Sequence, residues 1–308
     1  MQANKKNKKD LLPIVGIGAS AGGLNALKEF FKRVPDNSGL AFVVVVHLSP
    51  EHKSMLAELL QPHVKMPVTQ VSENQELKPN HVYVIPPKSN LNTIDTHLRL
   101  SEMEEKRSER APIDHFFRTL AKTHDGSAIG IILTGTGSDG TLGMKEIKEK
   151  GGLTIVQDPN EAEYDGMPQS AIATGLIDLV LPLDEIADYL IRFIKTEPRI
   201  KLPEDEKDID EEEAKLIRRV FSQVKARTGR DFARYKLSTL MRRMQRRMQI
   251  YEIELLPDYL ELLRKNPEEV RALSDDFLIN VTNFFRDKQV FEYLEQAVIP
   301  KLKKKKKS

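Results

Sequence analysis

Short, continuously apolar runs alternate with amphipathic helical stretches between residues 11 and 195. The run at residues 40–46, LAFVVVV, has no polar side chain, and the strings AIGIIL and LTIV follow further along the chain. A strand that is apolar on both faces must be buried on both faces, as happens in a parallel sheet covered by helices. The pattern therefore predicts a doubly wound, mostly parallel α/β domain over residues 11–195.

The pattern changes after this domain. Residues 196–213 carry two prolines and a dense acidic run, which predict a linker. From residue 214 to residue 300 helical periodicity dominates and predicts a small all-α domain. The ends of the chain, residues 1–10 and 301–308, are rich in lysine, and we expect both to be disordered, solvated tails.

Composition excludes several classes of function. The 48 basic and 46 acidic side chains leave a net charge of +2, so no chain-wide basic field indicates nucleic-acid binding. The absence of cysteine excludes a disulfide framework, a thiolate nucleophile and a zinc site with cysteine ligands. The histidines lack the spacing of paired metal ligands, so we expect no metal. No apolar run is long enough to span a membrane, and the N-terminus lacks a signal-peptide core, so we expect a cytoplasmic protein without membrane insertion.

The segment from Gly16 to Gly23, GIGASAGG, joins the first predicted strand to the first predicted helix and fits two motifs. As G-x-G-x-x-A it is typical of a dinucleotide site, where glycines let a pyrophosphate approach backbone N–H groups. That function needs an acidic residue at the end of the second strand, but this strand leads into His47. As G-x-S-x-G it is typical of a nucleophile elbow, a sharp turn that exposes Ser20.

The residues that follow two other predicted strands favour the elbow. A serine hydroxyl becomes nucleophilic when a base takes its proton, and the imidazole of His47 suits this near neutral pH. Asp139 follows a third strand, at the edge where the ligand sites of doubly wound sheets gather, and would orient the histidine. As an alternative, Asp139 belongs to an Asp-Gly turn and caps the helix that starts near Leu142. Together the three residues favour a serine hydrolase over a nicotinamide-dependent oxidoreductase.

Several strings in order carry a family resemblance: GIGASAGG, HLSP, HVYVIPP, PIDHFFRTLA, LTGTGSDGTLG and EYDGMPQSAIATG. Over roughly residues 11–195 the chain resembles the catalytic domain of the chemotaxis protein-glutamate methylesterases, the CheB type. The resemblance implies hydrolysis of γ-glutamyl methyl esters on the cytoplasmic helices of chemoreceptors, with deamidation of glutamines as a related reaction and no cofactor. The chain departs from the family in showing no receiver domain before residue 11, so we expect no control by phosphorylation within it.

The resemblance also implies roles for individual residues. The positions that match the hydrolytic triad of the family are Ser20, His47 and Asp139. The oxyanion site and pocket are expected at four further positions: Ala21, Gly22, Thr136 and Gly137. Thr136 is a departure, because the family often carries methionine there.

An arginine-rich helix is expected between Leu237 and Met248. Apolar residues recur there at helical spacing, so we expect its methionines to belong to the core. Four arginines lie on the flanks, and we expect them to bind carboxylates of an acidic helical partner, with a solvated face as the alternative: Arg242, Arg243, Arg246 and Arg247. No aromatic side chains are interleaved with them, which disfavours nucleic acid.

A second resemblance covers about residues 214–300. The strings VKARTGRDFARYKLSTLMRRMQRRM, DYLELLRKNPEEV and FLINVTNFFRD resemble the N-terminal helical domain of the chemotaxis receptor methyltransferases, the CheR type. In that family the matching threonine and arginine, Thr282 and Arg286, lie against S-adenosylmethionine. The cofactor is bound mainly by a following α/β domain with a glycine-rich segment, which the residues after Asp287 do not supply.

We therefore expect no methyltransferase activity from this chain alone, and S-adenosylmethionine would bind only if the module is completed elsewhere. Two other interpretations stay open. The chain is a non-catalytic scaffold that docks to receptors, or it is one fragment of a bifunctional methylesterase and methyltransferase.

Overall fold

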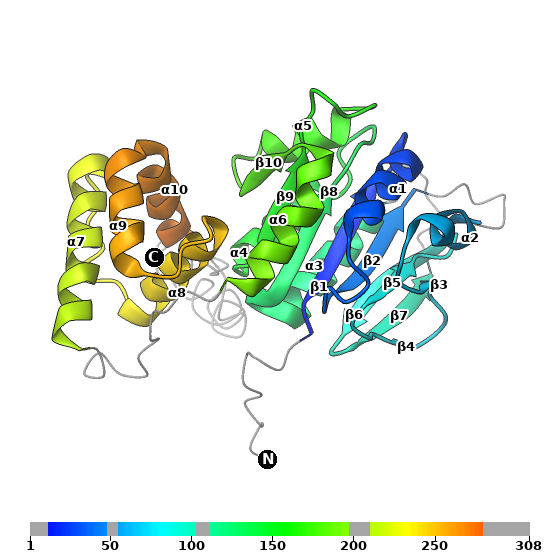
Figure 1. The fold of residues 1–308 in the computed structure, drawn as a ribbon, viewed down its shortest axis with the longest axis horizontal. Coiled ribbons are helices and arrows are strands. Elements are labelled where there is room, and N and C mark those ends of the chain that lie inside the picture. Colours follow the sequence, from blue (N-terminus) through cyan, green and yellow to red (C-terminus); the bar gives the residue numbers. More distant parts are fainter. Residues whose placement is uncertain (1–11, 48–54, 103–110, 197–209, 280–308) are drawn as a thin grey trace, which may run out of the picture.

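The computed structural model describes residues 12–47, 55–102, 111–196 and 210–279 (Figure 1). The two expected tails lie outside these ranges, as do Thr282, Arg286 and most of the expected linker. The described residues form an α/β unit before residue 197 and a helical unit after residue 209. No helix in these ranges is both long enough and apolar enough to cross a membrane.

A seven-stranded parallel sheet forms the centre of the α/β unit, in the order β10-β9-β8-β1-β2-β5-β3. Its central strands are buried along their whole length, as their uninterrupted apolar sequences predict. The strands are β1 (Ile14–Ala19), β2 (Ala41–Val46), β3 (Val68–Gln70), β5 (His81–Val84), β8 (Ala128–Ile132), β9 (Leu153–Gln157) and β10 (Leu179–Leu181).

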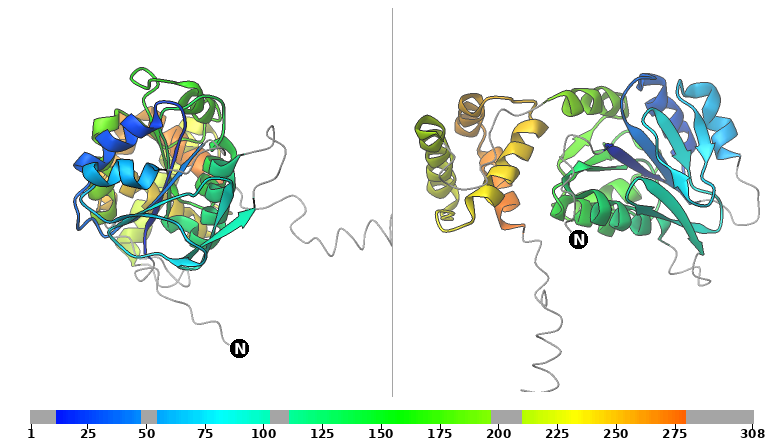
Figure 2. Two further views of the ribbon diagram at one scale, coloured as in Figure 1. Left: turned by 90° about the vertical axis from the view of Figure 1, so that its right-hand side faces the viewer. Right: turned by 90° about the horizontal axis from the view of Figure 1, so that it is seen from below.

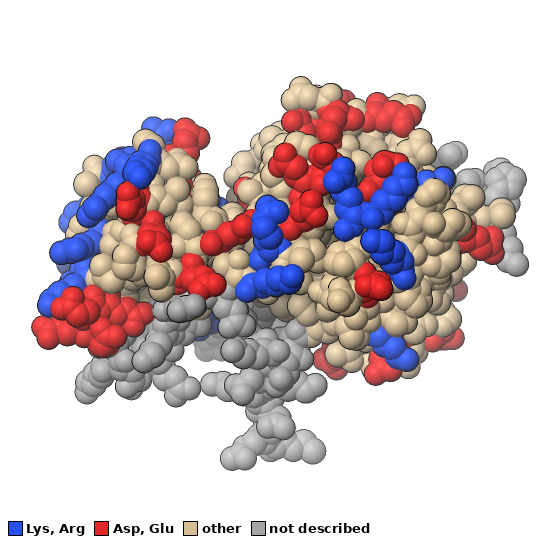
Figure 3. Space-filling view, in the orientation of Figure 1, with Lys and Arg blue, Asp and Glu red and all other residues tan. Residues whose placement is uncertain are grey.

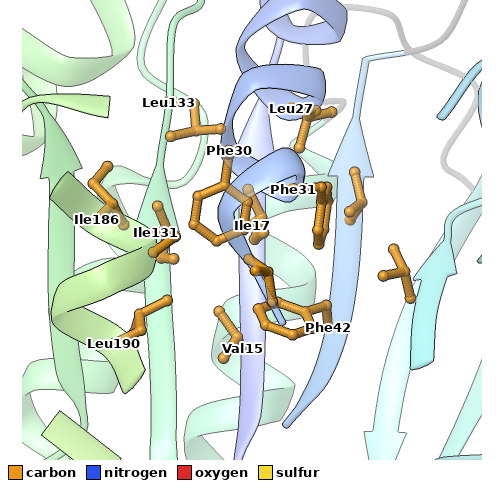
Figure 4. Packing of buried hydrophobic residues seen from close by; sticks show 14 of the residues in the cluster. Val15, Ile17, Leu27, Phe30, Phe31, Phe42, Ile131, Leu133, Ile186 and Leu190 are labelled. Atoms are coloured by element: carbon orange, nitrogen blue, oxygen red, sulfur yellow. The ribbon is translucent and has the colours of Figure 1, made fainter. Parts of the chain in front are cut away.

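Helices cover both faces of this sheet, which confirms the doubly wound fold. On one face, Phe30 of α1 and Leu190 of α6 pack with Val15 of β1, as Figure 4 shows. On the other face, Phe116 of α3 packs in one cluster with Ile14. Full burial of each such side chain contributes about 1.5–3 kcal/mol. The helices are α1 (Gly23–Arg33), α2 (Leu56–Leu60), α3 (Pro112–His124), α4 (Thr141–Glu149), α5 (Gly166–Ile172) and α6 (Leu183–Lys195).

A small antiparallel sheet, in the order β4-β7-β6, adds an element that the sequence pattern did not predict. Its strands alternate polar and apolar side chains and contain asparagine and threonine, a composition that is also typical of loops. His115 of α3 contacts this sheet through Nε2, which lies 2.8 Å from Asn92 Oδ1. The strands are β4 (Gln75–Glu76), β6 (Ser89–Ile94) and β7 (His97–Glu102), and short 3-10 turns stand at Gln61–His63 and Asp125–Ser127.

The helical unit contains four helices within residues 210–279. Asp210 caps the first of them by accepting the N–H of Glu213, and Asn266 caps the last. The methionines of the arginine-rich helix are buried in the core of this unit, as predicted: Met241, Met244 and Met248. The helices are α7 (Glu211–Thr228), α8 (Leu237–Ile250), α9 (Leu256–Lys265) and α10 (Pro267–Leu278).

The two units meet through the arginine-rich face of α8, beside the edge of the sheet that ends in β10 (Figures 1 and 2). Arg246 binds the carboxylate of Asp178, just before β10, and the carbonyl oxygen of Gly152, just before β9. Arg243 donates to the carbonyl oxygen of Glu149 at the end of α4, at 3.3 Å. The contact therefore lies at the amino ends of the outer strands.

These contacts correct the expectation of a separate partner for three of the four arginines of α8. Arg243, Arg246 and Arg247 are buried and bind carbonyl and carboxylate groups of their own chain. Arg242 alone of the four is exposed. The arginine pattern of α8 correctly indicated that its side chains bind carboxylates. Those carboxylates belong to the same chain and not to a partner.

An ion-pair network is buried at this contact. The side chain of Asp178 has no exposed surface and lies 2.6 Å from Lys148 Nζ, which also contacts Asp276 at 2.6 Å. Arg246 bridges the same two carboxylates from α8. Burial raises the pKa of Asp178, but Arg246, Lys148 and Arg247 together outweigh this effect and hold the pKa well below its ordinary value. Asp178 is thus charged and compensated by cations from both units.

Replacement of Arg246 tests how far the network holds the fold together. Arg246→Ala leaves Asp178 and Asp276 with too few cations, and removal of one partner of a buried ion pair costs about 3–5 kcal/mol. We expect a loss of that size in the free energy of unfolding, measured in urea. Arg242→Ala, on the exposed face of the same helix, is the matched control and should change stability by less than about 0.5 kcal/mol. Equal stability of the two variants would contradict the role of the network.

The network also predicts an acid-sensitive stability. The folded pKa of Asp178 lies below its unfolded value of about 3.9, so ionised Asp178 stabilises the fold above about pH 4. This contribution is lost as the pH falls from there toward the folded pKa. Asp178→Asn lacks the ionisation, so the stability difference between wild type and this variant should be full at neutral pH and should shrink below about pH 4. Urea titrations at constant ionic strength measure it, and a difference independent of pH argues against the prediction.

Candidate active site

Ser20 stands in the turn between β1 and α1, at the carboxyl edge of the sheet. Its N–H donates to the carbonyl oxygen of Thr134 at 3.0 Å, and its own carbonyl oxygen accepts from Gly23 at 2.9 Å. Gly22 has a φ of 74°, a left-handed conformation that glycine adopts without steric cost. The G-x-S-x-G pattern thus corresponds to the tight strand-to-helix turn that it predicts.

The other glycines of this segment make room for α3. A Cβ at Gly16 would lie 2.8 Å from the ring of Phe117, and one at Gly18 would lie 2.5 Å from Cγ2 of Ile113. Both neighbours belong to α3, which packs directly on β1. Helix packing therefore accounts for the G-x-G-x-x-A pattern, and β2 leads to His47 where a dinucleotide site needs an acid.

His47 follows β2 and lies between Ser20 and Asp139. Its Nδ1 is 3.4 Å from Ser20 Oγ, a long hydrogen bond. Its Nε2 is 2.9 Å from Asp139 Oδ2. The side chain of His47 is 35% exposed and that of Asp139 is 6% exposed, so the imidazole is open to solvent while the carboxylate is enclosed. The structure brings together three side chains that the sequence places after three different strands.

These contacts favour one tautomer of the imidazole. A carboxylate accepts hydrogen bonds, so the contact with Asp139 favours a proton on Nε2 of His47 and leaves the lone pair of Nδ1 toward Ser20. In the best-known Ser-His-Asp hydrolases the ring faces the serine with Nε2 instead. In the turned ring one nitrogen still faces the hydroxyl and the other still faces the carboxylate.

Asp139 is held by the first turn of α3. Its Oδ1 accepts the N–H of Asp114 at 2.8 Å and its Oδ2 accepts the N–H of Ile113 at 3.0 Å. These N–H groups have no partner within the helix, and the positive end of the helix dipole favours a carboxylate there. Asp139 is thus a helix cap, but of α3. The alternative that it caps the following helix is wrong, because the N-cap residue of α4 is Gly140 and the carboxylate of Asp139 instead accepts N–H groups of α3.

Thr134 fixes the backbone on the other side of Ser20, and sequence analysis did not single it out. Its Oγ1 lies 3.2 Å from the carbonyl oxygen of Ala21 and accepts the N–H of Tyr164 at 2.8 Å. Its N–H donates to Oε1 of Gln157, at the end of β9, at 2.9 Å. Many apolar strands are followed by a threonine, so the sequence alone does not indicate that Thr134 fixes the backbone beside Ser20.

The four expected oxyanion and pocket residues lie at the same edge of the sheet. Ala21 and Gly22 are half-buried and immediately precede α1, whose N-terminus carries a positive partial charge. Thr136 and Gly137 are exposed in the loop that leads from β8 to Asp139. Backbone N–H groups beside Ser20 are therefore in the region where an oxyanion would form.

An acidic loop borders this edge. Figure 3 shows acidic side chains gathered at the end of the α/β unit near α5. A Cβ at Gly22 would lie 2.8 Å from a carboxylate oxygen of Glu163, so this anion stands next to the turn of Ser20. This loop, residues 158–165, carries four acidic side chains: Asp158, Glu161, Glu163 and Asp165. Within the described ranges, no three or more side chains that could ligate a metal ion come together.

Comparison with protein families gives a match for each of the two units. The family model for CheB methylesterase matches residues 15–190. The chain belongs to the CheB methylesterase family. A second model, for the all-alpha domain of CheR methyltransferase, matches residues 215–278, which lie in the helical unit. Both resemblances inferred from the sequence are confirmed.

Individual relatives of the CheB domain extend this comparison. A putative protein-glutamate methylesterase/protein-glutamine glutaminase of Leptospira interrogans is 38% identical over 177 residues, which cover 57% of this chain and 92% of the relative. The crystal structure of the Thermotoga maritima CheB methylesterase catalytic domain has a TM-score of 0.54 and 32% sequence identity, and the match covers 58% of this chain and 97% of that one.

One relative covers both units. An uncharacterized 104.1 kDa protein of Rhodobacter capsulatus is 35% identical over 266 residues, or 80% of this chain. The match spans only 28% of the length of that protein.

Gly135 provides a test of how closely the CheB site is packed. A Cβ at Gly135 would lie 2.9 Å from Ser20 Cβ and 2.3 Å from Met167 Sδ, so Gly135→Ala must displace Ser20 or its neighbours. A displacement of about 1 Å costs about 100-fold in reactivity. We expect the rate at which a fluorophosphonate labels Ser20 to fall by about that factor.

Gly39→Ala is the control for Gly135→Ala. Gly39 has a φ of 76°, and nothing lies within 4 Å of an added Cβ. This variant therefore strains the backbone without crowding Ser20, and its labelling rate should equal that of the wild type. Unchanged labelling of Gly135→Ala would show that the site tolerates the added methyl group.

Proposed function

We propose that this chain hydrolyses γ-glutamyl methyl esters of a signalling protein, with Ser20 as nucleophile, His47 as general base and Asp139 as the group that orients the histidine. The observation that supports this most directly is the unbroken line of contacts from Ser20 through His47 to Asp139 in a CheB-family domain. An ester is a neutral electrophile that a serine with an adjacent base attacks without further groups. The proposed reaction therefore includes no cofactor.

The first half of the reaction forms an acyl-enzyme. His47 Nδ1 takes the hydroxyl proton while Ser20 Oγ bonds to the ester carbonyl carbon, and Asp139 stabilises the resulting imidazolium through the Nε2–H. The tetrahedral intermediate collapses when its carbon–methoxy bond breaks. His47 returns the proton to the leaving oxygen, so methanol departs and the γ-carboxyl of the substrate remains esterified to Ser20.

The second half of the reaction restores the enzyme. Water gives a proton to His47 as its oxygen attacks the acyl carbon, and the bond to Ser20 Oγ then breaks with return of that proton to the serine. The products are free Ser20 and the γ-carboxylic acid of glutamate, which loses its proton to solvent and leaves as the carboxylate. In both halves the oxyanion develops beside the N-terminus of α1, where the N–H groups of Ala21 and Gly22 are the proposed donors.

The acidic border of the site fits this reaction. The substrate ester is neutral and the product is an anion, and a carboxylate beside the turn of Ser20 repels only the latter. Glu163 therefore favours binding of the methylated side chain and release of the demethylated one.

Deamidation is a second reaction that the same site supports. A glutamine side chain gives the same acyl-enzyme, with ammonia in place of methanol as the leaving group. The Leptospira relative carries both activities in its name. We infer that the substrate segment presents both methylated glutamates and glutamines.

We propose that the partner is the cytoplasmic helical region of a chemoreceptor, so that the chain acts in the cytoplasm. The CheR-type unit is proposed to dock rather than to transfer methyl groups. Its expected S-adenosylmethionine contacts, Thr282 and Arg286, lie outside the described residues, and methyl transfer is not part of this proposal.

Ser20→Ala tests the proposed chemistry. Without the nucleophile no acyl-enzyme forms, so methanol release from a methylated receptor segment should fall by at least about 1000-fold. Gas chromatography of methanol measures this, and Ser222→Ala, at an exposed serine of α7, should match the wild type. Methanol release that persists in Ser20→Ala removes Ser20 from the mechanism. A wild type that binds the receptor but resists fluorophosphonate would instead indicate a non-catalytic scaffold.

A further inference from the structure

Two aspartates cap each other's helices beside the site. Asp139, which precedes α4, accepts the N–H groups of Ile113 and Asp114 in α3. In return, Asp114 Oδ1 accepts the N–H of Gly143 in α4 at 2.7 Å. Each helix thus begins with a carboxylate from the other helix or its approach loop, and the first turns of α3 and α4 are tied together in both directions.

The first turns of α3 and α4 are packed so closely that one helix cannot slide along the other. A Cβ at Gly143 would lie 2.4 Å from Phe117 Cβ and 3.2 Å from the backbone of Asp114. Gly140, between Asp139 and α4, has a φ of 94°, and a Cβ there would lie 2.8 Å from Ile113 Cγ2. The backbone of α4 at Gly143 therefore packs directly against α3, with no space between the two helices. A shift of α4 along α3 would move the loop that carries Asp139.

The environment of Asp114 disfavours a charged carboxylate, because the side chain is buried and lies close to the carboxylate of Asp139. Only 8% of the residue is exposed. Burial raises the pKa of Asp114, and the nearby charge of Asp139 adds to this effect. The position requires an acceptor oxygen for the N–H of Gly143, and an amide oxygen meets this requirement equally well.

We propose that Asp114 is a positioning residue of the esterase: by fixing the start of α4 on α3 it holds the carboxylate of Asp139 at His47. This inference rests on the proposed hydrolytic function. Asp114 contacts neither Ser20 nor His47 among the described hydrogen bonds, so it acts through Asp139.

The test compares three variants of the full chain. Asp114→Ala removes the acceptor and should lower both kcat for methanol release and the fluorophosphonate labelling rate of Ser20 by about 100-fold, with KM unchanged. Asp114→Asn keeps the acceptor oxygen and should restore both rates to within about threefold of the wild type. Asn266→Ala removes the cap of α10 in the helical unit, and it should lose thermal stability but neither rate.

The outcomes separate this inference from the function on which it rests. Wild-type rates in folded Asp114→Ala would overturn the positioning role while Ser20 still reacts. Absence of methanol release from the wild type would overturn the proposed substrate, yet the labelling rates would still report on Asp114. If Asp114→Ala does not fold, Asp114→Glu applies the same test, because its longer side chain displaces the oxygen, and wild-type rates there would also overturn the inference.

Discussion

The parallel pairing of β1 with both of its neighbours is the constraint on which the site depends. β2 and β8 flank β1, and all three run in the same direction. Parallel strands end at a common edge, so the segments that follow them emerge side by side. Ser20, His47 and Asp139 meet for this reason, although they are far apart in the chain.

Two helix N-termini supply positive partial charge beside these residues. Ser20 leads into the N-terminus of α1, and Asp139 lies on the N-terminus of α3. Both are positions where a helix dipole stabilises negative charge, permanent in the carboxylate and transient in an oxyanion. The glycines that bring α3 close to β1 and α4 thus help to place these helix ends beside the site.

Sequence reasoning anticipated the parts of the molecule that follow from strand order. The apolar runs gave the parallel sheet, and the residues after them gave Ser20, His47 and Asp139 as neighbours. It missed interactions that depend on which element packs beside which. Asp114 looks like an ordinary acid in a first helical turn, and the antiparallel sheet has a composition shared with loops. The arginines of α8 carried the right chemistry, but a one-dimensional pattern contains no information on whether the complementary carboxylate is internal.

The arginine face of α8 is covered where Arg246 binds the carboxylate of Asp178, so this face is accessible only if that contact opens. A separate acidic protein that binds the basic face of this helix would have to displace Asp178. The carboxylate of Asp178 belongs to the same molecule and is already buried against the arginines. Such a partner gains access only when the two units separate, which breaks the ion pairs of Arg246 with Asp178 and of Lys148 with Asp276. The arrangement therefore reserves the arginine face of the CheR-type unit for its own esterase domain unless another ligand pulls the units apart.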